Sequence, residues 1–140
     1  MALITSRERT DWPETFWSEI ETRPLVIPVE ALDWPGLKDA IANVVSDVME
    51  HFPGCHAKDC VITTVQPGAY VAPHVDMHSP EWRTRIHVPL ISNPQADFMV
   101  NDTMYNLKPG QAYKVNTEVM HSIRNGGTTN RIHLMFDVYE

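Results

Sequence analysis

The chain has 140 residues and a formal net charge of −7, with 43% hydrophobic and 21% charged residues. This length suits one domain with a core of its own, and the composition is that of an ordinary globular protein. The acidic balance argues against nucleic-acid binding, which uses Lys and Arg clustered on one face. The first ten residues contain no apolar run long enough for a signal peptide, and no apolar run in the sequence reaches the roughly 20 residues of a membrane span. We therefore expect a single cytoplasmic domain, residues 1–140, that binds neither nucleic acid nor a membrane.

The first part of the chain is predicted to contain short secondary-structure elements. A cap-type residue, a proline and acidic residues suggest a short helix from Thr10 to about Thr22. We expect Trp12 and Trp17 to pack on the outside of a barrel. The apolar run Leu25–Val29 predicts an edge strand, because a proline near its end has no N–H for a central ladder.

The clearest helix is predicted from about Pro35 to Phe52. Apolar residues recur there at three- and four-residue spacing, and Pro53-Gly54 ends the pattern. Such an apolar stripe needs a sheet to cover. We expect residues 1–57 to form a helical support for the rest of the chain.

From Asp59 onward the pattern changes to short strands separated by turns. Runs of alternating residues end at Pro, Gly and Asn, which is typical of a small antiparallel sandwich or barrel. The fold we predict is mainly β with N-terminal helices, a double-stranded β-helix of the cupin-like jelly-roll type, with residues 58–140 as its core. The expected strands are Cys60–Val65, Tyr70–His74, Arg83–Ile91, Phe98–Val100, Met104–Leu107, Ala112–Val115, His121–Arg124 and Arg131–Tyr139.

A candidate metal site begins at His74-Val75-Asp76. Residues two apart in a strand point to the same face, so His74 and Asp76 would present an imidazole and a carboxylate side by side. His121 is the best candidate for a third ligand, and His78 is a rival because it continues the alternation. Two His and one carboxylate that leave other positions open are the pattern of non-haem Fe(II) oxygenases.

Arg131 predicts a binding site for an acid near this metal. It follows His121 across Asn125-Gly126-Gly127, which we interpret as the turn of a hairpin with the two residues on neighbouring strands. A guanidinium there could pair with the far carboxylate of a 2-oxo acid that chelates the metal. The alternative is a surface arginine, or one that pairs with Asp137.

A set of short motifs recurs in a recognisable order between Thr63 and Asp137, a little over half of the chain. This segment resembles the aspartyl/asparaginyl β-hydroxylase family of 2-oxoglutarate (2OG)-dependent oxygenases. The residues that carry the resemblance are Pro67-Gly68, Pro73-His74, Arg85-Ile86-His87, His121 with Asn125, Arg131 and Asp137.

The resemblance implies Fe(II) as the metal, with 2OG and O2 as co-substrates. It implies that Arg85, His87 and Thr63 help to hold 2OG and that Arg131 binds its far carboxylate. The implied reaction is a hydroxylation that releases succinate and CO2. The small domain, without an evident peptide-docking appendage or basic groove, favours a small substrate such as an amino acid or a peptide side chain. The animal enzymes for which the family is named have Gly where this chain has Asp76, so the complete three-ligand set resembles other branches of the superfamily.

Other residues have more than one interpretation. His87 would face the same side as Arg85, but it could also be a core histidine, and we interpret His133 as packing. Trp82 and Arg83 follow the metal motif and are expected to contact the substrate at the rim of the pocket.

Two other function classes remain open from the sequence. One is a jelly-roll module that binds a metal or ligand without turnover, and the other is a cupin-type enzyme that does not use 2OG. Arg131 together with Arg85 favours the 2OG-dependent enzyme over both. Cys55 and Cys60 have His51 and His56 nearby, but their spacing is loose for a metal site, so we expect two reduced thiols.

Overall fold

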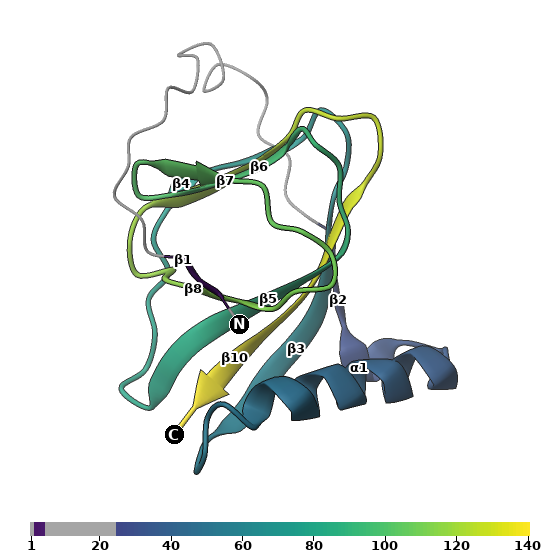
Figure 1. Ribbon diagram of the computed structural model, residues 1–140, viewed down its shortest axis with the longest axis vertical. Coiled ribbons are helices and arrows are strands. Elements are labelled where there is room, and N and C mark those ends of the chain that lie inside the picture. Colours follow the sequence, from purple (N-terminus) through teal and green to yellow (C-terminus); the bar gives the residue numbers. More distant parts are fainter. Residues whose placement is uncertain (1, 5–24) are drawn as a thin grey trace.

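The computed structural model describes residues 2–4 and 25–140. The helix predicted from Thr10 to Thr22, with Trp12 and Trp17, lies outside the described residues. The described chain forms two β-sheets that face one another, with a long helix outside the larger sheet (Figure 1).

The larger sheet has six strands and the smaller has four. All neighbouring strands run antiparallel, except that β1 runs parallel to β8. In spatial order the larger sheet contains β1 (Ala2–Ile4), β8 (Tyr113–Val115), β5 (Trp82–Ile91), β10 (Arg131–Tyr139), β3 (His56–Val65) and β2 (Leu25–Pro28), and the smaller contains β4 (Tyr70–His74), β9 (His121–Asn125), β6 (Ala96–Val100) and β7 (Thr103–Tyr105).

Successive strands from β3 to β6 alternate between the two sheets, and so do β7 to β10. This winding is the jelly roll, or double-stranded β-helix, and it confirms the predicted fold. The strands expected from the sequence are all present with small differences at their ends, and β2 is an edge strand as its proline requires. The hairpin predicted between His121 and Arg131 is wrong: β9 belongs to the smaller sheet and β10 to the larger, so the chain crosses between sheets there.

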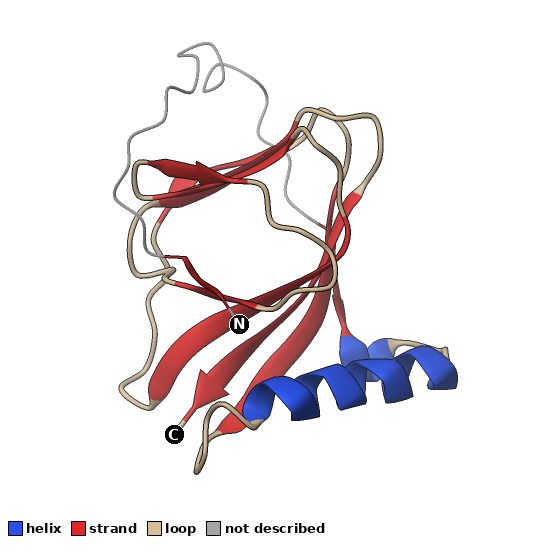
Figure 2. Cartoon of the chain, in the orientation of Figure 1, coloured by secondary structure: helices blue, strands red, loops and turns tan. Residues whose placement is uncertain are grey.

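The helical part consists of a short 3-10 turn, Val29–Ala31, and helix α1, Pro35–Met49. The proline at the start of α1 suits the first turn, because the backbone N–H groups of that turn have no hydrogen-bond partner within the helix and proline has no N–H. Figure 2 shows α1 lying outside the larger sheet. Within the described residues, no helix has the length and apolar character needed to cross a membrane.

One hydrophobic core lies between α1 and the outer face of the larger sheet. Ile41 and Val48 of α1 are buried against apolar side chains that alternate along β5 and β10. The buried strand residues of this core are Ile86, Val88, Leu134, Phe136 and Val138.

A second, smaller core lies around β6 and β8, and it is accompanied by buried polar residues. Its buried apolar members are Phe98, Val100, Leu107, Tyr113 and Val115. The neighbouring positions along β5, β9 and β10 carry buried side chains that can ionise or hydrogen-bond. Since a buried polar group is unfavourable without a partner, this interior is the part of the fold where a function is expected.

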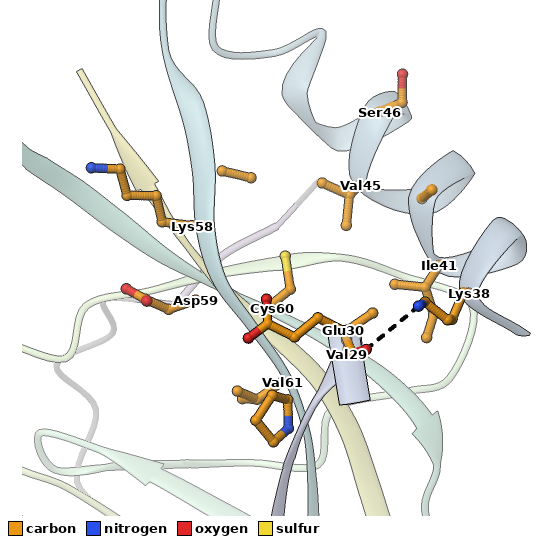
Figure 3. A pocket seen from close by; sticks show the side chains of 13 residues that line it. Val29, Glu30, Lys38, Ile41, Val45, Ser46, Lys58, Asp59, Cys60 and Val61 are labelled. Atoms are coloured by element: carbon orange, nitrogen blue, oxygen red, sulfur yellow. Dashed lines mark hydrogen bonds between the residues drawn. The ribbon is translucent and has the colours of Figure 1, made fainter. Parts of the chain in front are cut away.

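An open groove of about 770 Å³ lies between α1 and β3, over the outer face of the larger sheet (Figure 3). Ile41, Val45 and Val61 line it, and Lys38 at its edge donates a hydrogen bond to the carbonyl oxygen of Glu30 (3.5 Å). The groove is therefore separate from the polar interior.

Both cysteines are free thiols. Cys60 lines the groove, and burial raises the pKa of its thiol, so the group stays protonated at neutral pH. Among residues 2–4 and 25–140, the groups of His, Cys, Asp and Glu that could hold a metal do not include either cysteine.

Asn125 connects the crossover after β9 to both sheets. Its side chain is fully buried, and its Nδ2 donates to the carbonyl oxygens of Val65 (2.8 Å) and Thr129 (2.8 Å). Its Oδ1 accepts hydrogen bonds from Asn93 Nδ2 (3.1 Å) and from the backbone N–H of Gly127 (3.1 Å). One buried amide thus makes four hydrogen bonds that tie the crossover to β3 and to the loop at Asn93.

We predict that Asn125→Ala destabilises the fold by about 2–4 kcal/mol, because the four hydrogen bonds of one buried amide are lost at once. Urea denaturation followed by circular dichroism measures the change. Asn130→Ala, at an exposed position of the same crossover, is the matched control and should change stability by less than about 0.5 kcal/mol. Equal stability of the two variants would contradict this role of Asn125.

Candidate metal centre

His74 and His121 form a cross-strand pair in the smaller sheet. His74 ends β4, His121 begins β9, and the antiparallel register places them opposite one another. Their ring centroids are 4.3 Å apart. Because opposite residues of neighbouring strands project from the same face, the register alone brings the two imidazoles together.

Asp76 completes the group from the segment that follows β4. Its backbone N–H donates to the carbonyl oxygen of Thr117 (2.9 Å), which fixes the chain at this point. Its Oδ1 lies 3.6 Å from Nε2 of His74, and its Oδ2 lies 3.3 Å from Nε2 of His121. One ligand atom from each of the three residues lies within 4.8 Å of the others. The structure thus brings together the three residues predicted as metal ligands.

The two imidazoles are oriented by backbone carbonyls. Nδ1 of His74 lies 2.7 Å from the oxygen of Ala72, and Nδ1 of His121 lies 2.9 Å from the oxygen of Val119. A carbonyl oxygen can only accept, so Nδ1 carries the proton in each ring and Nε2 is left to face the centre. This arrangement is the usual outer support of metal-binding histidines.

The charge at the centre also suits a divalent cation. Burial alone would raise the pKa of Asp76, but the close approach of the His121 ring and the charge of Arg85 outweigh it and keep that pKa below its usual value. The carboxylate is therefore ionised at neutral pH. Two imidazole nitrogens and one carboxylate fit an Fe(II) ion held on one side.

His78, the rival ligand, makes other contacts. Its Nε2 lies 3.0 Å from Oγ1 of Thr117, and its ring stacks on the indole of Trp82 with centroids 3.6 Å apart. It does not belong to the metal group formed by the described residues.

Arg85 connects the metal group to a buried acid. Its Nη1 donates to Oδ2 of Asp76 (2.7 Å), while Nε and Nη2 donate to the two oxygens of Asp137 (2.8 and 3.0 Å). Burial would lower the pKa of Arg85, but the hydrogen bonds to Asp137 outweigh burial and raise it. The partner of Asp137 is therefore Arg85, so Arg131 is left for another role.

Arg131 is buried in the interior, and no carboxylate of residues 25–140 forms an ion pair with it. Its residue is 3% exposed, and its Nη2 has no hydrogen-bond partner among the described residues. Burial lowers the pKa of Arg131 to about 9, so the guanidinium still carries its charge at neutral pH. Its Cζ lies 5.8 Å from the ring centroid of Phe98, whose ring is stacked parallel to that of His121 at 6.5 Å. Phe98 therefore contacts both the metal group and the buried cation.

His87 and His133 lie beside this cation as a neutral pair. Their Nδ1 atoms are 3.0 Å apart, so one ring donates a proton that the other accepts. Burial, followed by the charges of Arg131 and Arg85, holds the pKa of His87 well below its ordinary value; burial and Arg131 do the same to His133. The packing role predicted for His133 omits this contact, although alternation along β10 puts His133 on the same face as Arg131.

The remaining predicted site residues have different surroundings. Thr63 is buried on β3, and its hydroxyl donates to the backbone oxygen of His133 (3.5 Å). Trp82 is 8% exposed, and its indole N–H has no partner among the described residues. Arg83 lies at the surface, pairs with Glu140 and donates to the carbonyl oxygens of Pro80 (2.9 Å) and Trp82 (3.1 Å).

Comparisons with known proteins agree with this fold. The aspartyl/asparaginyl β-hydroxylase family matches residues 38–140, while a search of curated proteins finds no match. An oxidoreductase of the 2OG-Fe(II) oxygenase family from Burkholderia pseudomallei has a similar structure: the TM-score is 0.60 at 14% identity, over 73% of this chain and 55% of that one. A viral collagen prolyl hydroxylase from Paramecium bursaria Chlorella virus-1, in a 2OG complex, gives a TM-score of 0.59 at 14% identity, over 84% of this chain and 80% of that one. At such low identities, these two structures support the fold alone. The family match, by contrast, covers most of the sequence. The chain therefore belongs to the aspartyl/asparaginyl β-hydroxylase family, whose members are oxygenases.

Proposed function

We propose that this protein is an Fe(II)- and 2OG-dependent oxygenase that hydroxylates a small substrate, such as an amino acid or a peptide side chain, and releases succinate and CO2. The observation that carries the proposal is that one interior holds both a group of three potential metal ligands and a buried arginine whose Nη2 has no partner in the described part of the chain. A group of metal ligands alone, or a buried arginine alone, occurs in several classes of protein. The presence of both in one interior fits a site that binds a metal together with an acid that chelates it.

His74, Asp76 and His121 would hold the iron. Bound there, Fe(II) supplies the reactivity toward O2 and 2OG that amino-acid side chains lack. The chain's own contribution is to present two Nε2 atoms and one carboxylate from one side and to leave the other side open to ligands. The Nδ1 bonds to Ala72 and Val119 orient both imidazoles so that Nε2 faces the centre.

Arg131 would bind the far carboxylate of 2OG. A buried guanidinium without a partner is strongly unfavourable, and a carboxylate that forms a bidentate pair with it removes this penalty. The neutral His87 can donate a hydrogen bond to the same acid without adding a second buried charge. Thr63 lies on the neighbouring strand β3, where its hydroxyl could also reach the acid.

The proposal includes a substrate that is a small molecule or a short peptide. Trp82 and Arg83 stand at the start of β5, close to the segment that carries Asp76, and are the residues we expect it to contact. Succinate release measured with a panel of amino acids and short peptides would identify the substrate class, and a matched set of Trp82→Phe and Arg83→Lys variants would show whether these side chains set KM.

The binding of 2OG is tested by anaerobic titration of the Fe(II)-loaded protein. We predict a weak visible charge-transfer band when 2OG is added to the wild type. Arg131→Ala should lose the band or require far more 2OG to produce it, because the far carboxylate then has no buried partner. Arg83→Ala removes an exposed arginine instead and should keep the wild-type titration curve.

A wild-type protein that binds Fe(II) tightly but gives no band with 2OG would contradict this function. That result would favour a cupin-type enzyme that does not use 2OG, or a metal-binding module without turnover. A band that survives in Arg131→Ala would contradict the role of Arg131 alone.

The buried histidine pair also predicts how stability depends on pH. The pKa values of His87 and His133 are lowered in the folded state, so below about pH 6.5 the unfolded chain binds more protons than the folded one. Stability should therefore be full above about pH 6.5 and should fall as the pH decreases, by up to about 1.4 kcal/mol per pH unit for each histidine.

Urea denaturation between pH 8 and pH 5 measures this slope. His133→Gln should make the decline shallower, whereas His51→Gln, at an exposed position, should keep the wild-type slope. A wild-type stability that stays constant from pH 7 to pH 5 would show that these rings take up protons in the folded state.

A further inference from the structure

Each of the three candidate metal ligands has an outer partner that holds it in place. For His74 and His121 the partners are the carbonyl oxygens of Ala72 and Val119. Asp76 lies in the segment after β4, outside the strand ladder, so its carboxylate needs a different support. That support comes from the guanidinium of Arg85, whose Nη1 lies 2.7 Å from Oδ2 of Asp76.

The position of the guanidinium is itself fixed by Asp137. Arg85 on β5 and Asp137 on β10 are directly opposite in the antiparallel register. Asp137 binds the Nε and Nη2 edge of the guanidinium at 2.8 and 3.0 Å, in the bidentate geometry that constrains direction as well as distance. The side chain of Asp137 is only 7% exposed, so water competes little for this pair. The remaining Nη1 is thereby directed at Asp76.

This geometry leaves Arg85 poorly placed to serve the co-substrate. Nε, Nη1 and Nη2 of Arg85 each donate to a carboxylate oxygen of Asp76 or Asp137. The two negative charges of these carboxylates exceed the single positive charge of Arg85. Arg131, by contrast, has a free donor and no acid paired with it among the described residues. The two arginines therefore differ in what they can still bind.

We infer that Arg85 is a positioning residue for the metal ligand Asp76, held in place by Asp137, rather than a binding residue for the co-substrate. The inference rests on the metal centre of the proposed function, and it departs from the role that the family resemblance gives to Arg85. By keeping Oδ2 occupied, Arg85 turns Oδ1 toward His74 and holds the carboxylate at the centre before any metal arrives.

The sign of the effect distinguishes positioning from simple charge. A guanidinium near a cation site repels the cation, so removal of its charge would strengthen metal binding if charge were its only effect. If Arg85 acts by holding Asp76, its removal frees the carboxylate and weakens metal binding. Partners of this kind are typically worth about 10–100-fold in metal affinity.

The test is a Co(II) titration of the full chain without 2OG, followed by visible absorption. We expect Arg85→Lys, Arg85→Gln and Asp137→Asn each to raise the Kd for Co(II) by about tenfold or more and to change the shape of the Co(II) band. Because Asp137 acts through Arg85, the double variant Arg85→Lys/Asp137→Asn should be little weaker than the weaker of its two single variants. Arg131→Lys is the control arginine and should keep the wild-type Kd for Co(II), while its affinity for 2OG at saturating Co(II) falls.

Three outcomes would overturn the inference. Unchanged or tighter Co(II) binding by Arg85→Gln would show that charge, not positioning, is its effect. A normal Kd for Co(II) in Arg85→Lys together with weaker 2OG binding would assign Arg85 to the co-substrate. Normal Co(II) binding by Asp137→Asn, with melting curves that show a folded protein, would remove Asp137 from the arrangement.

The same titrations separate this inference from the proposed function. Failure of the wild type to bind 2OG, with Co(II) affinity still dependent on Arg85 and Asp137, would contradict the function and leave the positioning role standing. Failure of the wild type to bind Co(II) at all would contradict both.

Discussion

The cross-strand pairing of His74 with His121 is the constraint on which the rest of the site depends. The two residues meet because β4 and β9 are antiparallel neighbours in this one register. Side chains alternate between the two faces of a sheet, so a slip of one residue would turn one imidazole away from the other. With that pair fixed, Asp76 follows two residues after His74 and completes a group that could hold a metal. The jelly-roll fold thus fixes the register of β4 with β9 in which these side chains meet.

The larger sheet separates a supporting face from a functional face. Leu134 and Phe136 of β10 pack toward α1, while Arg131, His133 and Asp137 of the same strand carry the buried polar chemistry. A buried cation that has no anion among residues 25–140 and two buried neutral histidines are unfavourable for folding, and the apolar layer under α1 offsets them. Because the unpaired charge of Arg131 is unfavourable in the folded state, an acid that binds there would stabilise the folded protein.

The sequence predicted the elements and the metal group better than it predicted which strands are neighbours. Periodicity located α1 and the strands, and the His-x-Asp spacing located two members of the group that could hold a metal, because both signals are local. Which strand pairs with which is not local: the hairpin expected before Arg131 is instead a crossover between sheets, and the partner of Arg85 is Asp137 on β10. Alternation along one strand reports a shared face, but not what lies opposite, so a paired arginine and an unpaired one cannot be distinguished from sequence.

The most direct test of this account is an anaerobic crystal structure of the protein with Mn(II), as a redox-inert stand-in for Fe(II), and 2OG. The account predicts the metal on Nε2 of His74, Nε2 of His121 and a carboxylate oxygen of Asp76, with the far carboxylate of 2OG on the guanidinium of Arg131. A metal bound elsewhere, or 2OG bound at the metal with Arg131 still lacking an anion, would contradict it.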